Sequence, residues 1–317
     1  RRQPFEAYLW AQFDLVLANL QSGRHQEAAE QAQILVNLLG GMSPAPEGSA
    51  SAWSLLGIAR ARLGQGNQAV QALRRAALDD PSEDNWLNLT RELMEISNYA
   101  DAISVAKEAI GSKPASYALH LRLGAAQLAA GQYTEAESTF RALVEAGDPL
   151  PTSYVGLAQV LLREGRAQDA ANELAAAKQR VGQTFLVEYF LGLSLDRAGK
   201  RTEAIAELRE AIRLNPRSSE AYLALGKSEL ALRREKEAIA DLEEALRLNP
   251  GHVQARRLLS QAYRKTGDLN NAAKYAETSN NKQPAPEGDL LGDFLLPGWQ
   301  VPPEDAGNGS KLPKRSP

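Results

Sequence analysis

The chain has 317 residues, a formal net charge of −3 and 44% hydrophobic residues. Such a composition is that of a folded protein, and the slight acidity argues against general affinity for nucleic acid, which needs a clearly basic surface. The chain has no cysteine, which excludes disulfides and thiolate sites, and no apolar run of about 20 residues that would span a membrane.

Alanine recurs along the chain at a nearly fixed interval, which is 34 residues from Ala102 onward. A leucine precedes each of these alanines at a constant distance. A period of this length predicts a helix–turn–helix unit repeated along a solenoid, so the expected fold class is all-α. The alanines are Ala28, Ala69, Ala102, Ala136, Ala170, Ala204, Ala238 and Ala272, and the leucines are Leu15, Leu56, Leu89, Leu123, Leu157, Leu191, Leu225 and Leu259.

The period divides the chain into three parts. Residues 1–8 lead in, residues 9–283 form eight repeats with an insertion near 40–49, and residues 284–317 form a tail rich in proline and glycine. The insertion either folds over the edge of the repeats or is a length change that the fold tolerates. The repeats are expected to begin near Leu9, Ala50, Glu83, Tyr117, Pro151, Phe185, Ser219 and Val253.

Glycine is expected to end the first helix in six of the eight repeats, because a left-handed residue at a helix end costs glycine nothing. Ser97 and Arg233 take that place in the other two repeats, so those turns need a different geometry or carry strain.

Small and large residues alternate in a way that predicts close helix packing. Glycines such as Gly226 are expected to let the two helices of a repeat approach, while larger residues such as Leu242 fill the space between repeats. Tyr222, Leu225 and Leu232 recur at helical spacing and form an apolar helix face. Glu229 lies on the same face and is expected to be its one exposed residue.

One stretch carries Trp53, Leu56 and Gly57, followed by Ala69, Leu73 and Pro81. It resembles the tetratricopeptide repeat family, whose pattern is W-x2-L-G-x2-Y, then A-x3-F, then P. The resemblance covers about residues 9 to 283. It implies a right-handed α-solenoid whose first helices line a concave groove, and it implies a protein partner without naming one.

The resemblance also places particular first-helix positions in that groove, and most of them are cationic here. Such a surface suits acidic peptides, because guanidinium groups grip carboxylates in bidentate geometry. Alternatively, these cations pair with acidic neighbours such as Asp84, Glu95, Asp196 and Glu220. The expected lining is Arg62, Arg91, Gln159, Arg163, Arg197, Lys227, Arg257, Gln261, Arg264 and Lys265.

The first repeat is apolar where the others are cationic. Trp10, Phe13 and Leu17 have the spacing with which a groove receives an apolar partner helix, or they pack against the segment before Leu9.

The tail is too apolar for a simple linker, and exposed apolar segments usually mark an interaction site. It either docks on the repeats of its own chain or is a linear motif for another protein. The apolar residues are Leu290, Leu291, Phe294, Leu295, Leu296 and Trp299.

No catalytic, metal-binding or cofactor-binding motif stands out, since His25, His120 and His252 are far apart and no phosphate-binding loop is present. The sequence therefore predicts a non-catalytic, bacterial-type scaffold or adaptor that helps assemble a multiprotein complex. The alternatives are a permanent subunit of one complex and the regulatory arm of a larger enzyme. A periplasmic or other extracytoplasmic location is favoured over a cytoplasmic one.

Overall fold

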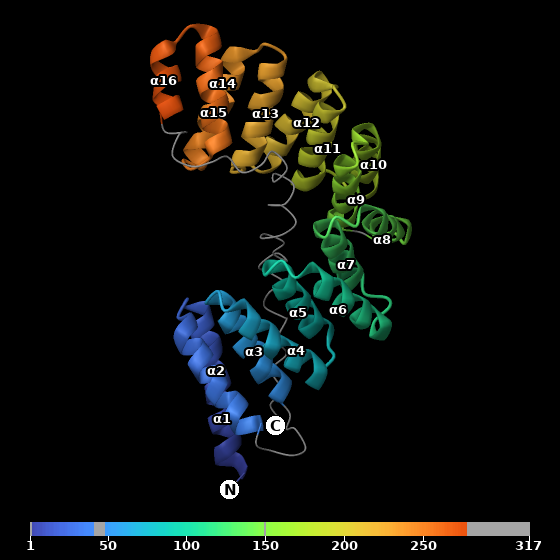
Figure 1. Ribbon diagram of the computed structural model, residues 1–317, viewed down its shortest axis with the longest axis vertical. Helices are drawn as coiled ribbons and strands as arrows, with labels where there is room; N and C mark the ends of the chain where they lie inside the picture. The colour runs from blue at the N-terminus through green and yellow to red at the C-terminus, as the bar shows by residue number, and fades with distance from the viewer. Residues whose placement is uncertain (1, 41–47, 149, 278–317) are drawn as a thin grey trace. The chain divides into compact units, whose positions relative to one another are not determined.

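The computed structural model describes residues 2–40, 48–148 and 150–277. These residues form sixteen α-helices and no strand (Figure 1). They divide between Gln132 and Tyr133 into two compact bodies, called here the N-terminal and C-terminal units. None of the described helices is both long enough and apolar enough to cross a bilayer.

The N-terminal unit holds seven of these helices. They are α1 (Arg2–Gln21), α2 (His25–Gly40), α3 (Ser49–Arg62), α4 (Gly66–Asp79), α5 (Glu83–Glu95), α6 (Tyr99–Ser112) and α7 (Tyr117–Ala129).

The described part of the C-terminal unit holds the other nine. They are α8 (Tyr133–Glu145), α9 (Pro151–Arg163), α10 (Ala167–Arg180), α11 (Phe185–Arg197), α12 (Arg201–Leu214), α13 (Ser219–Ala231), α14 (Glu235–Leu248), α15 (Val253–Thr266) and α16 (Leu269–Glu277).

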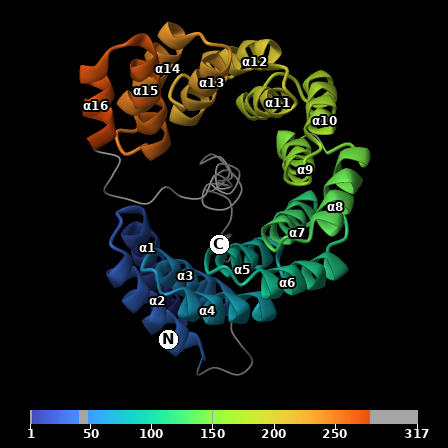
Figure 2. The same ribbon diagram turned by 45° about the horizontal axis from the view of Figure 1, so that its top comes forward.

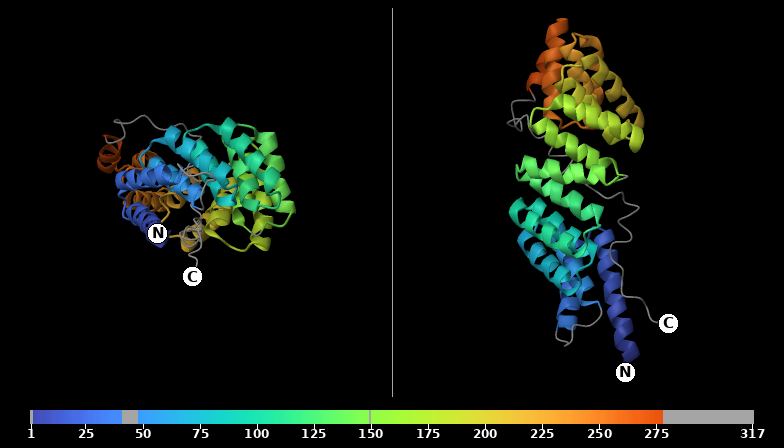
Figure 3. Two further views of the ribbon diagram at one scale, coloured as in Figure 1. Left: turned by 90° about the horizontal axis from the view of Figure 1, so that it is seen from below. Right: turned by 90° about the vertical axis from the view of Figure 1, so that its right-hand side faces the viewer.

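Within each unit the helices form two layers (Figures 2 and 3). The first helices α3, α5 and α7 contact one another in succession and form one layer of the N-terminal unit. In the C-terminal unit α9, α11, α13 and α15 do the same. The exposed side of these layers is called here the first-helix face. The predicted all-α, helix–turn–helix architecture is confirmed.

Several helix starts follow from local hydrogen bonds. The side chains of Ser116 and Ser218 accept hydrogen bonds from the backbone N–H groups of Leu119 (3.1 Å) and Ala221 (3.2 Å), which satisfies donors that a helix start leaves without partners. Proline stands at the start of α9, where its missing N–H costs nothing. The first helix begins at Arg2, so the predicted lead-in before Leu9 is helical from that residue onward.

Close approach within a repeat depends on the predicted glycines. A Cβ added to Gly226 would lie 2.7 Å from Cγ of Leu242 and 3.3 Å from the carbonyl oxygen of Ala238, and Gly192 has the same contacts with Leu208 and Ala204. Leu242 therefore packs on the glycine of its own repeat, in addition to any space that it fills between repeats. Phe140 behaves as predicted, because its ring covers Gly156 of the following repeat.

The two turns without glycine keep the same backbone conformation as the others. Ser97 has φ 58° and Arg233 has φ 59°, while Gly64 and Gly199 at equivalent turns have φ 70° and 82°. Both turns therefore keep the left-handed geometry with its strain, and neither adopts a different geometry.

Glu229 corrects a prediction, because its side chain is 0% exposed. It lies between α12 and α14, where Nη2 of Arg209 contacts Oε1 of Glu229 at 3.0 Å. Burial, followed by the neighbouring carboxyl of Asp241, raises the pKa of Glu229 to about 8. The apolar period identified the correct helix face, but it did not show that the second layer covers that face completely.

Glu188 is a second buried carboxyl group. It contacts Nζ of Lys178 at 3.0 Å, and the same Nζ contacts Glu207 at 2.9 Å. Burial and the neighbouring Glu207 carboxyl raise the pKa of Glu188 to about 7, against the opposing effect of Lys178.

Most of the predicted insertion near 40–49 and all of the apolar tail residues, Leu290, Leu291, Phe294, Leu295, Leu296 and Trp299, lie outside the described residues. Docking of the tail therefore stays a prediction.

Candidate partner-binding surfaces

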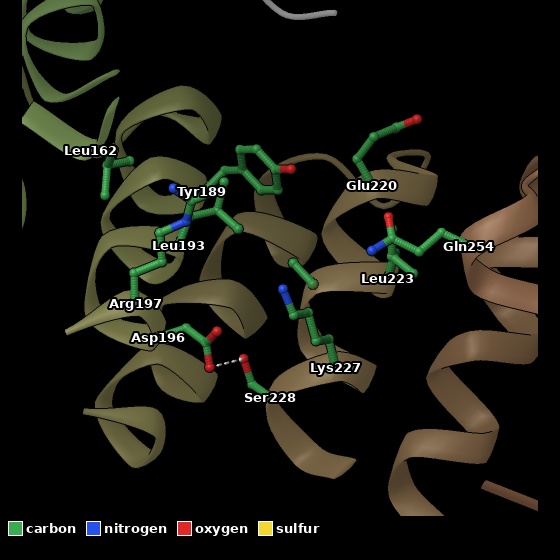
Figure 4. Close-up of a pocket in the computed structure, with 11 residues that line it drawn as sticks. Leu162, Tyr189, Leu193, Asp196, Arg197, Glu220, Leu223, Lys227, Ser228 and Gln254 are labelled. Atoms are coloured by element: carbon green, nitrogen blue, oxygen red, sulfur yellow. Dashed lines mark hydrogen bonds between the residues drawn. The ribbon is translucent and has the colours of Figure 1, made fainter. Parts of the chain in front are cut away.

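The C-terminal unit has a pocket on its first-helix layer (Figure 4). Its walls come from α9, α11, α13 and α15, so four successive repeats contribute to it. Figure 4 shows the side chain of Lys227 directed into the pocket, toward the helix that carries Leu193 and Arg197. The lining residues are Leu162, Tyr189, Leu193, Asp196, Arg197, Glu220, Leu223, Ala224, Lys227, Ser228 and Gln254.

Both carboxylates of this pocket, Asp196 and Glu220, accept hydrogen bonds from neighbouring serine hydroxyl groups. Asp196 accepts a hydrogen bond from the Ser228 hydroxyl at 3.0 Å and lies 3.8 Å from Nε of Arg201. Glu220 accepts a hydrogen bond from the Ser219 hydroxyl at 2.8 Å.

The two cations of the pocket, Arg197 and Lys227, are exposed and form no ion pair with any described residue. The pocket thus offers two available cations beside the apolar side chains of Leu193 and Leu223. Chemically, it suits a side chain or chain end that carries a carboxylate next to an apolar group.

Three arginines stand on consecutive first helices of the N-terminal unit. Arg62 ends α3, Arg91 lies within α5 and Arg122 lies within α7. Desolvation and then the charge of Arg62 lower the pKa of Arg91, even though part of its side chain reaches solvent. Desolvation and then the charge of Arg91 lower the pKa of Arg122 to about 10. The three guanidinium groups therefore form one electrostatically connected set, called here the arginine row.

No ion pair neutralises the arginine row within the part of the chain that the structure describes. Arg91 donates a hydrogen bond to the Asn88 amide oxygen at 3.0 Å. The Glu95 carboxylate lies near enough to Arg91 and Arg122 to raise their pKa values but forms no salt bridge with either. The row thus retains an excess of positive charge.

The apolar residues of the first repeat largely belong to the core. Phe13 is 3% exposed and packs with Val16, Ala28 and Ala32, which corrects its prediction as a partner contact. Trp10 and Leu17 are half-buried against the same cluster, and the rings of Trp10 and Phe13 lie 6.0 Å apart. The helix spacing that suggested an incoming helix is satisfied by α2 instead.

Gln159 also corrects a prediction, because it is 0% exposed and neither atom of its amide group has a hydrogen-bond partner. Every residue of α9 from Ser153 to Leu162 is buried. Apart from Leu162, which lines the pocket, this part of α9 consequently has no exposed side on which a partner could bind.

The remaining predicted residues are exposed on first helices. They are Arg163 on α9 and Arg257, Gln261, Arg264 and Lys265 on α15. The alternative in which the predicted cations pair with acidic neighbours fails for Arg62, Arg163, Arg197, Lys227, Arg264 and Lys265, since none of them forms an ion pair among the described residues.

Sequence reasoning missed Arg122, Tyr189 and Gln254. Arg122 has a visible signal, because it is the only arginine or lysine in α7, whose other residues are mostly apolar. Tyr189 has no such signal, since its position in α11 is typical of a core residue. Burial, followed by the charge of Glu220, raises the pKa of Tyr189. No group of three potential metal ligands occurs among the described side chains.

Comparisons with known proteins agree on the architecture. A family model described as tetratricopeptide repeat matches residues 87–151, 189–242 and 226–281. A tetratricopeptide repeat protein from Parabacteroides merdae is similar at 15% identity and TM-score 0.62, over 80% of this chain and 98% of that chain. A chain of the APC/C hetero-tetramer Cut9–Hcn1 is similar at 19% identity and TM-score 0.56, over 78% of this chain and 48% of that chain.

A search of curated proteins found no match. Identities this low show the fold alone, because one fold carries many functions.

Proposed function

The chain belongs to the tetratricopeptide repeat family, and from that premise we propose that it is a non-catalytic scaffold that binds protein segments on its first-helix face and helps assemble a multiprotein complex. Solenoid repeats form extended surfaces that generally serve protein interaction.

The observation that carries the proposal is the pocket around Lys227. Four successive first helices contribute to it, so a bound segment would contact several repeats at once. Its carboxylates are engaged by neighbours, while Lys227 and Arg197 have no ion pair among the described residues. Cations with no partner, placed beside apolar side chains, favour an acidic residue flanked by apolar ones.

Site-specific crosslinking tests this assignment directly. A photoreactive amino acid at residue 227, introduced into the full chain in its source organism, is expected to crosslink a discrete set of proteins that mass spectrometry identifies. The matched control places the same group at Lys236, which is exposed on α14 of the second layer. Equal crosslinking patterns at both positions would contradict the proposal.

Affinity for the identified partner provides the second measurement. Lys227→Ala and Arg197→Ala should each weaken binding by about tenfold, which corresponds to loss of one charge-assisted contact of about 1.4 kcal/mol. Lys236→Ala should leave the affinity unchanged. If Lys227→Ala and Arg197→Ala also bind as the wild type does, the pocket is not the binding site.

A further inference from the structure

The arginine row of the N-terminal unit has a geometry that specifies more than a preference for negative charge. We infer that Arg62, Arg91 and Arg122 bind an extended acidic peptide that carries a carboxylate at every third residue. The inference rests on the proposed function, because it treats the first-helix face as a peptide-binding surface, but it assigns a different unit and a defined register.

The placement of the row supports this inference first. The three arginines stand on α3, α5 and α7, and each of these helices packs against the next. The charge of Arg62 lowers the pKa of Arg91, and the charge of Arg91 lowers the pKa of Arg122. One cation per repeat thus runs across the packed helices rather than along one of them.

The surrounding acids do not neutralise the row. The charge of Glu92 raises the pKa of Arg91, but Glu92 is buried, forms no salt bridge with Arg91, and has its carboxylate close to Gly66 at the start of α4. Glu95 is exposed on α5 and is the remaining acid that acts on both Arg91 and Arg122. Mutual repulsion among three cations is unfavourable, and bound carboxylates would relieve it.

The spacing sets the register. Packed helices lie about 8–10 Å apart, and each successive arginine stands a few residues nearer the start of its helix, which adds an offset of about 5–8 Å along the helix axis. The two displacements combine to about 9–12 Å, and three residues of an extended chain span about that distance at about 3.3–3.6 Å each. A carboxylate at every third residue therefore meets one arginine per repeat. Contiguous acidic residues would place most of their charge between the arginines.

A peptide fits the row better than a nucleic acid does. Single-stranded nucleic acid is held by a long basic track with aromatic side chains on which bases stack. The row is a short track in a chain of net charge −3. Planar guanidinium groups also match the geometry of individual carboxylates.

The test uses the full chain and two fluorescent peptides of equal composition, measured by anisotropy at low salt. One peptide spaces its glutamates by two neutral residues, and the other places them side by side. The spaced peptide should bind about tenfold more tightly, and Arg91→Gln and Arg122→Gln should each remove most of that advantage. Arg91→Lys should retain only part of the preference for the spaced peptide, because lysine keeps the charge but cannot bind a carboxylate in the bidentate geometry of a guanidinium group.

Lys107→Gln is the matched control, since Lys107 is an exposed cation on α6 in the second layer of the same unit. It should bind both peptides as the wild type does. Equal affinity for the two peptides would overturn the register, and an unchanged affinity in Arg91→Gln would overturn the site. Tighter binding of a labelled single-stranded oligonucleotide, lost in Arg91→Gln, would overturn the peptide assignment.

The two proposals fail separately. Lys227→Ala changes the C-terminal unit and should leave the preference for the spaced peptide intact. If crosslinking at residue 227 shows no specific partner while the spaced peptide is still preferred, the pocket assignment fails and the arginine row stands.

Discussion

At the scale of single residues, the buried Glu229 carboxyl couples the C-terminal unit to pH. One of its oxygens contacts Arg209, and Asp241 lies near enough to share its proton. The folded-state pKa is raised to about 8, whereas an exposed glutamate titrates near about 4.3. The stabilisation is therefore complete below the unfolded pKa and is lost as the pH rises through the folded pKa.

Glu229→Gln should remove the part of this dependence that Glu229 carries, while Glu188, whose pKa is also raised, to about 7, keeps its own part. The wild type is expected to lose at least about 1.4 kcal/mol of stability between about pH 5 and pH 9, the equivalent of one pKa unit, while the variant should lose less. Urea unfolding across that range measures the effect. Glu203→Gln, an exposed glutamate on α12, is the control and should follow the wild type. Parallel pH profiles for Glu229→Gln and the wild type would contradict the assignment.

Ser97 allows the strain of the turns to be measured. Ser97→Gly should stabilise the protein by about 0.5–1 kcal/mol, because glycine adopts a positive φ without the cost that a side chain brings. The reciprocal Gly64→Ser should destabilise it by a similar amount through the backbone alone, since nothing lies within 4 Å of a Cβ at Gly64. Thermal unfolding of both variants checks the pair, and a shift of the same sign in both would rule out this explanation.

At the scale of helix pairs, each contact between a glycine and a leucine sets how closely the two layers approach. Gly226→Ala should destabilise the protein by about 1–3 kcal/mol, because the added methyl group would overlap Cγ of Leu242. Chemical denaturation measures this. Gly251→Ala is the control, as a Cβ there would meet only Asn249 at 3.5 Å.

The side chain that the added methyl group would overlap, Leu242, can be shortened as well. In the Leu242→Ala background, Gly226→Ala should cost less than it does alone, since the contact that it disturbs is absent. Additive effects of the two substitutions would show that the glycine matters for another reason.

The helices were predictable from sequence because one local rule repeats. Leucine, glycine and alanine occupy the same contacts in successive repeats, so α7, α9, α11, α13 and α15 begin at Tyr117, Pro151, Phe185, Ser219 and Val253, where the period starts its units. Side-chain depth was less predictable. Position within a repeat identifies the face of a helix, but neighbouring helices decide whether that face is covered, as they do at Glu229 and Gln159.

The candidate site was predictable only in part for the same reason. Arg197 and Lys227 were identified because their positions face outward in any repeat of this kind, and both line the pocket. Arg122 was missed because it stands at a position that was not assigned to the groove. Phe13 was assigned to partner binding although the first repeat needs it for its own core.

At the scale of the whole molecule, the repeats contact mainly their neighbours, which makes stability a local property. Gly226→Ala should therefore raise amide hydrogen exchange in α12 to α15 and leave the exchange of α3 to α5 unchanged. Hydrogen exchange followed by mass spectrometry resolves the two regions. Uniformly faster exchange across the described helices would mean that the chain unfolds as one cooperative body.

The recurring contact of Gly226 with Leu242, and of Gly192 with Leu208, makes the 34-residue segments interchangeable building blocks. Residues 219–252 begin with one first helix and end just before the next, so a second copy inserted after residue 252 would present to α15 the same surface that α14 presents now. Such an insertion would keep the helix pair inside each copy, and its one new junction would place α14 of the first copy against α13 of the second.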